Sequence, residues 1–219
     1  MNSRHRIAVP NLDAGDLTAL ASLDADDGSI AEFTFAGQVR DLDLTGLLLR
    51  AGILDGVEAQ RVLLAAGTHL QSVLLTDCTF TALRSENSRL TRVAFRGCRL
   101  MGATFEDCTL DHVLFDSCRL DYATFTRVRA AGPVIFTNCR LTEARFDACT
   151  LEKAAIENCE LPEAEFGPGR YRHLDLRGSD LSRVIGASRL SGAIISPDQE
   201  HQLAQALITA LDLTVADDA

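Results

Sequence analysis

The chain has 219 residues, of which 47% are hydrophobic, and a formal net charge of −10 at pH 7. This length and composition predict one well-buried domain. The acidic charge argues against direct binding to nucleic acid or to an anionic membrane, because both would repel the protein. Since no apolar run is long enough for a signal peptide or a membrane span, we expect a cytoplasmic protein.

The N-terminal residues show no internal repeat. Residues 1–28 are expected to form an N-terminal cap over one end of the repeat region that follows them. A cap is needed there because unpaired strand edges at the end of a sheet invite aggregation.

A period of five residues organises the middle of the chain. Large apolar residues occur at every fifth position: Leu90, Phe95, Leu100, Phe105, Leu110, Phe115, Leu120 and Phe125. After one extra residue near Gly132 the series resumes as Phe136, Leu141, Phe146, Leu151, Ile156, Leu161 and Phe166. Helices repeat every 3.6 residues and strands every 2, so this period requires a turn within each repeat.

A small or slender residue lies two positions before each of these apolar centres, as in Cys98, Ala103, Cys108 and Val113. The pattern small-x-Leu/Phe-x-x resembles that of the pentapeptide-repeat family over residues 70–195, with weaker repeats back to about residue 30. The resemblance implies an all-β solenoid, a right-handed quadrilateral β-helix with twenty residues per coil. We therefore assign residues 29–196 to the β-helix.

The spacing of the cysteines tests the twenty-residue coil independently. Once the extra residue is allowed for, equivalent positions form one column: Cys78, Cys98, Cys118, Cys139, Cys159 and Ser179. Coils stacked at the β spacing of about 4.8 Å would give roughly eight coils and a rod about 40 Å long. The sequence alone therefore supports the coil length that the resemblance implies.

The C-terminal residues 197–219 are expected to form a helix and a tail. Ser196 and Pro197 begin a capping box with proline at the first helical position, so the helix should run from about Pro197 to Leu211. Its apolar stripe is formed by Leu203, Leu207 and Leu211. This stripe could cap the rod or join two chains, and in related proteins this end does both, so we expect a homodimer through the C-terminus.

Neither the cysteines nor the histidines indicate a reaction centre. Cysteine spacings of ten and twenty residues match no zinc pattern, and an odd count without a signal peptide favours reduced thiols that fill small buried positions. The five histidines are scattered, and none has a recurring nucleophile or carboxylate beside it. We expect no enzymatic activity, no metal and no cofactor.

An acidic segment is the candidate partner-binding surface. Residues 143–166 contain seven carboxylates against Arg145 and Lys153, a net charge of −5. Those carboxylates are Glu143, Asp147, Glu152, Glu157, Glu160, Glu163 and Glu165. A solvated acidic face is the alternative interpretation. A column of Arg99, Arg119 and Arg140 could instead contact phosphates, which leaves direct nucleic-acid binding as a further alternative.

The resemblance also implies a function. The chain is similar in size, acidity and C-terminal helix to bacterial quinolone-resistance and toxin-immunity proteins, which mimic double-stranded DNA and engage DNA gyrase or topoisomerase IV. It implies a non-enzymatic DNA mimic that binds such a topoisomerase and modulates it or protects it from quinolones or toxins. Some of those proteins carry loops, whereas no insertion longer than one residue interrupts residues 75–166. The alternative is a scaffold for an unrelated protein partner.

Overall fold

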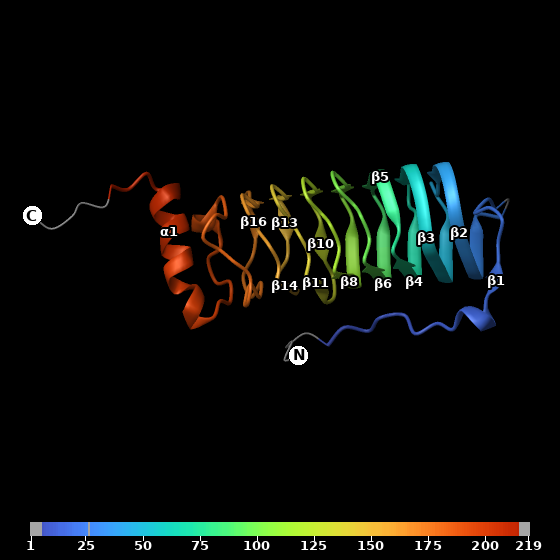
Figure 1. Cartoon of the computed structure of the whole chain (residues 1–219), viewed down its shortest axis with the longest axis horizontal. Helices are drawn as coiled ribbons and strands as arrows, with labels where there is room; N and C mark the ends of the chain where they lie inside the picture. The colour runs from blue at the N-terminus through green and yellow to red at the C-terminus, as the bar shows by residue number, and fades with distance from the viewer. Residues whose placement is uncertain (1–5, 26, 215–219) are drawn as a thin grey trace, which may run out of the picture.

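The computed structural model describes residues 6–25 and 27–214 of the chain. These residues form a β-solenoid of about seven turns, with one α-helix at its C-terminal end (Figure 1). The predicted class, a pentapeptide-repeat β-helix with a C-terminal helix, is confirmed.

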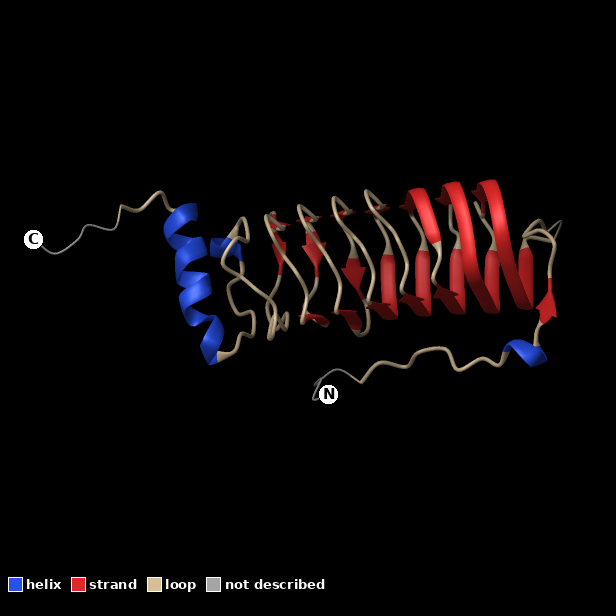
Figure 2. Ribbon diagram, viewed as in Figure 1, coloured by secondary structure: helices blue, strands red, loops and turns tan. Residues whose placement is uncertain are grey.

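The strands pair in parallel, and the described part of the chain forms one 16-stranded sheet wound around the rod axis (Figure 2). Three short 3-10 helices lie outside it: η1 (Ala14–Asp16), η2 (Ala187–Arg189) and η3 (Pro197–Gln199). The strands are β1 (Thr18–Ala19), β2 (Ser29–Asp43), β3 (Leu48–Leu64), β4 (His69–Thr76), β5 (Thr79–Glu86), β6 (Arg89–Arg96), β7 (Thr104–Glu106), β8 (Thr109–Asp116), β9 (Thr124–Thr126), β10 (Arg129–Ala130), β11 (Val134–Thr137), β12 (Arg145–Asp147), β13 (Cys149–Thr150), β14 (Ala154–Glu157), β15 (Glu165–Phe166) and β16 (Gly169–Arg170).

The strand register fixes the length of each coil. One column of paired residues runs through Ser29, Leu48, His69, Arg89, Thr109, Arg129, Thr150 and Arg170. Each step along this column is about twenty residues, as expected for four five-residue repeats. The extra residue lies where the sequence placed it, because Ala130 pairs with Leu110 whereas Val134 pairs with Val113.

The apolar centres stack through the middle of the rod. Phe115 packs face to face against Phe95 and Phe136, with ring centroids 4.8 and 4.7 Å apart. It also meets Phe105 and Phe125 edge to face. Every predicted centre from Leu90 to Phe166 is buried in this core, and so are the small residues two positions earlier. The core is therefore a filled column with stacked and edge-on ring contacts.

The N-terminal segment lies along the flank of the rod. From η1 it runs back beside the solenoid toward its middle (Figure 2), where the Ala8 N–H donates to His112 Nδ1 at 2.9 Å. Ile7 lies there in an open groove with Leu114 and Ile135. Strand β1 pairs with β2 at the N-terminal end of the sheet. The segment therefore reaches over a flank as well as joining the first coil.

The C-terminal helix α1 (Glu200–Ala210) follows η3, so the expected helix begins with a 3-10 turn and ends within one residue of its predicted end. The predicted capping box is present between Ser196 and Gln199. Leu203 and Leu207 are half-buried against the core of the rod. Leu211 is 58% exposed. Within the described residues, no helix has both the length and the apolar character needed to cross a membrane.

Candidate partner-binding surface

The acidic segment encircles the rod. Residues 143–166 are longer than one coil, so their side chains face every side. Glu152 and Glu157 lie on two of the four faces: Glu152 follows strand β13, and Glu157 is the last residue of strand β14. The other five carboxylates lie on the two remaining, adjoining faces: Glu143, Asp147, Glu160, Glu163 and Glu165.

Arginines of neighbouring coils neutralise four of the seven carboxylates. Glu163 pairs with Arg183, and the other pairs are Glu165 with Arg145 at 3.5 Å, Glu160 with Arg140 at 4.0 Å and Glu152 with Arg170 at 3.1 Å. Three of these arginines lie outside residues 143–166 in sequence. Counting them, seven carboxylates face five cations, so the local charge is −2 and no longer −5.

Three of the predicted carboxylates have no cation of the described residues within ion-pair distance. Glu143, Asp147 and Glu157 form no ion pair with any residue that the structure describes. Glu143 and Asp147 are exposed, and Glu157 is half-buried. Glu143 stacks on the coil that carries Glu163, as the sequence predicted, and Arg183 on the following coil relieves the like-charge contact. The freest carboxylates are therefore Glu143 and Asp147.

The arginine column exists but is held by a buried acid. Arg99, Arg119 and Arg140 occupy successive coils. The carboxylate of Asp121 is 2% exposed and lies 3.0 Å from Arg140 Nε and 3.8 Å from Arg119 Nε. Two of the three guanidinium groups are thus drawn toward the rod, which weakens this column as a phosphate-binding surface.

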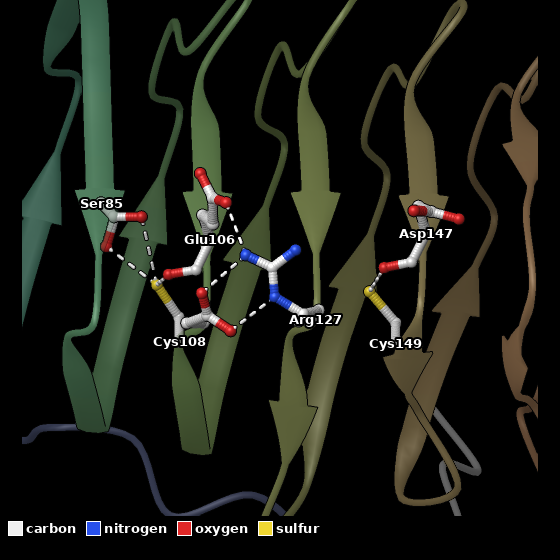
Figure 3. Close-up of polar contacts among 7 residues, drawn as sticks. Ser85, Glu106, Cys108, Arg127, Asp147 and Cys149 are labelled. Carbon is white, nitrogen blue, oxygen red and sulfur yellow. Dashed lines mark hydrogen bonds and ion pairs between the residues drawn. The ribbon is translucent and has the colours of Figure 1, made fainter.

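A single arginine, Arg127, is neutralised in the same way by two carboxylates (Figure 3). Arg127 donates to both oxygens of Asp107 at 2.7 Å and to Glu106 at 2.6 Å. The hydrogen bonds from Arg127 lower the pKa of Asp107 below its usual value. The hydrogen bonds to Asp107, and after them the one to Glu106, raise the pKa of Arg127. Acid and base here come from adjacent coils, twenty residues apart in sequence.

All seven cysteines are buried and carry free thiols. The predicted ladder is present, since the Cys139 N–H donates to Cys159 Sγ at 3.3 Å and Cys159 N–H donates to Ser179 Oγ at 3.0 Å. In Figure 3, Cys149 Sγ donates to the carbonyl of Asp147 at 3.3 Å. Burial raises the pKa of Cys149 to about 11, so its thiol stays protonated and unreactive at neutral pH.

The histidines and acids do not converge on a reaction centre in the described part of the chain. No group of three or more His, Cys, Asp or Glu side chains there could hold a metal ion. His69 contacts Thr91 Oγ1 at 3.2 Å, and its burial lowers its pKa. His112 accepts the N–H of Ala8. His5 lies outside the described residues.

Residues 68–132 match the family model described as a pentapeptide repeat region. The resemblance predicted from the repeat is therefore confirmed. No curated protein matches the chain.

Solved structures similar to the chain include full-length QnrB1, a plasmid-mediated fluoroquinolone resistance protein, with 18% identity and a TM-score of 0.42 over 82% of this chain and 99% of QnrB1. A trypsin-treated form of QnrB1 has 17% identity and a TM-score of 0.45, over 83% of this chain and 100% of that one. HetL, a pentapeptide repeat protein involved in heterocyst differentiation regulation from the cyanobacterium Nostoc, has 16% identity and a TM-score of 0.35, over 75% and 86%.

Proposed function

We propose that this pentapeptide-repeat protein is a non-enzymatic binding protein whose partner is a type II topoisomerase, DNA gyrase or topoisomerase IV. It would occupy the DNA-binding surface of the enzyme in the cytoplasm and compete with DNA. Such binding would inhibit the enzyme or protect it from quinolones or toxins.

This proposal rests on the carboxylates that lie on two adjoining faces of the rod. Glu143 and Asp147 are exposed and free of ion pairs with the described residues, and Glu163 and Glu165 lie on the next coil. Successive coils repeat at about 4.8 Å, so carboxylates at one repeat position on adjacent coils, such as Glu143 and Glu163, lie about that far apart along the rod. Duplex DNA carries one charge per roughly 1.7 Å, so the rod is a sparser mimic whose fit depends on where each carboxylate lies.

We also propose that the protein acts as a symmetric homodimer joined through its C-terminal helices. Leu203 and Leu207 already contact the rod, so Leu211 is the member of the predicted stripe that remains available. Leu213, just beyond the helix, is similarly exposed at 57%. A two-fold contact would bury these leucines against their own copies and place two rods end to end.

The test is a supercoiling assay with purified gyrase and a relaxation assay with purified topoisomerase IV. The protein should inhibit supercoiling in competition with DNA, and added salt should weaken the inhibition because exposed charges are screened. Replacing the two free carboxylates, Glu143→Gln with Asp147→Asn, should raise the inhibitory concentration several-fold without unfolding the rod.

A matched control separates the chosen faces from net charge. Asp55→Asn with Glu157→Gln removes the same two charges from a different face of the rod and should change inhibition much less. Equal effects of both pairs would refute the assignment to the faces of Glu143. If the protein leaves supercoiling, relaxation and quinolone-stabilised cleavage unchanged at high micromolar concentration, the topoisomerase proposal fails and an unrelated protein partner takes its place.

A further inference from the structure

Cations gather on one face of this otherwise acidic rod. We call it the basic face; its outward residues flank the buried column that includes Leu70, Leu90 and Leu110. Over the coils from Leu49 to Tyr171 it carries two carboxylates, Asp111 and Glu152, against seven cations, a net charge of +5 on a chain of net charge −10; Glu32 lies on the coil before and Arg189 on the coil after. The seven cations are Arg50, Arg89, Arg92, Arg129, Lys153, Arg170 and Arg172.

Most cations of the basic face have no acidic partner. Among the described residues only Arg170 forms an ion pair, with Glu152, and Lys153 Nζ donates to the carbonyl of Ala131 at 2.8 Å. The five other arginines are exposed and form no ion pair with the residues described. Elsewhere on the rod most arginines lie against a carboxylate, among them Arg61, Arg119, Arg127, Arg140, Arg145, Arg177 and Arg183.

The register holds these cations in straight columns. Arg89 and Arg129 share one column with Thr109 between them, and Arg170 follows after Thr150. At about 4.8 Å per coil, each arginine of this column lies about 10 Å from the next, and the hydroxyl group of Thr109 or Thr150 lies between them. Guanidinium groups bind carboxylates through two parallel hydrogen bonds. Mutual repulsion of these cations falls when an anion lies across them.

We propose that the basic face binds an acidic protein segment, an extended chain rich in Asp and Glu. The face is one five-residue repeat wide, about 15 Å, which suits a single peptide chain. Carboxylates border it, with Glu106 and Asp107 toward one side and Asp116 and Glu157 toward the other. A nucleic-acid duplex is wider and densely charged, so its phosphates would overlap these borders and meet the repulsion of the acidic rod.

The proposal is independent of the topoisomerase proposal, and a direct binding assay tests it. A fluorescent polyglutamate peptide of about ten residues spans most of the rod at about 3.3 Å per residue. Its polarisation is measured with the full-length protein at low salt. The triple variant Arg89→Gln, Arg92→Gln and Arg129→Gln should bind the peptide at least tenfold more weakly than the parent protein.

The control removes the same charge from the other three faces. Arg84, Arg96 and Arg99 are exposed, form no ion pair with described residues and lie on one each of those faces. Replacing all three with Gln should weaken binding less than threefold, although both triples lose three positive charges. Thermal melting of both variants establishes that the rod remains folded.

Three results would each overturn the proposal. Equal weakening by the two triples would mean that net charge alone governs binding. Failure of polyglutamate to bind the parent protein at low salt would mean that the face takes no acidic chain. Tighter binding of duplex DNA than of polyglutamate, lost in the basic-face triple, would assign the face to nucleic acid. None of these measurements involves a topoisomerase.

Discussion

The buried cysteines fill positions that demand small volume. Cys118 lies in the ladder between Cys98 and Cys139, is almost fully buried, and its Sγ donates to the carbonyl of Phe95 at 3.4 Å. Equivalent positions in other repeats hold Ala or Val, such as Ala103. Thiol hydrogen bonds are weak, so packing should dominate at this site.

We expect Cys118→Ala to cost about 1 kcal/mol of unfolding free energy and to leave the fold intact, because it deletes one buried atom. Cys118→Leu should cost about 1 to 3 kcal/mol, because extra methylenes overpack a narrow core. Urea unfolding followed by circular dichroism measures both. If the alanine variant loses as much as the leucine variant, the thiol contacts and not the volume stabilise the column.

Among the elements, the C-terminal helix depends on one buried side chain. Gln199 Nε2 donates to the carbonyls of Leu176 and Ser179 at 2.7 and 2.6 Å, and its Oε1 accepts from the N–H and hydroxyl of Ser196. These bonds join the start of the helix to the last coil. The Leu176 carbonyl also accepts from the Ser179 N–H, whereas Gln199 supplies the donor for the carbonyl of Ser179.

Gln199→Ala should therefore destabilise the protein by about 1 to 3 kcal/mol, since the Ser179 carbonyl is left without a donor and an unsatisfied buried polar group costs about that much. Urea unfolding measures the loss, and the helical signal should melt before the β signal. Gln205→Ala, on the exposed side of the same helix, is the control and should change stability by less than about 0.5 kcal/mol. A loss no larger than that of the control would mean that other contacts hold the helix.

The repeat region and the helix could be predicted because their signals are periodic. The five-residue period predicted the buried centres, the Gly132 register slip and the cysteine ladder, and the capping box predicted the helix start. The contact between Ala8 and His112 could not be predicted from the sequence. Ala8 lies in a non-repetitive segment 104 residues before His112, so no periodic signal links the two residues. The ion pairs of the acidic segment were also missed, although counting residues one coil away would have revealed Arg183 as the partner of Glu163.

On the scale of the whole molecule, the two exposed leucines at the C-terminal end determine how two rods could meet. Changing Leu211→Glu and Leu213→Glu leaves the half-buried Leu203 and Leu207 in contact with the rod. If the proposed dimer forms there, like charges should then face each other across the two-fold axis and separate the chains.

Light scattering should give about twice 23.7 kDa for the parent protein and 23.7 kDa for the double variant. The circular dichroism of the variant should match that of the parent, because neither leucine is part of the core. A parent mass of one chain would refute the dimer. An unchanged dimer mass in the variant would place the interface elsewhere.

Each coil pairs only with the coil before it and the coil after it. This arrangement limits which insertions the gene can accept without disrupting the rod. A tandem duplication of residues 109–128 would insert one more turn between two compatible turns and lengthen the rod by about 4.8 Å. An in-frame insertion that is not a multiple of the turn would instead shift every later column against the one before it. We therefore expect homologous rods to differ in length by whole turns, while the N-terminal segment and the C-terminal helix remain at the two ends.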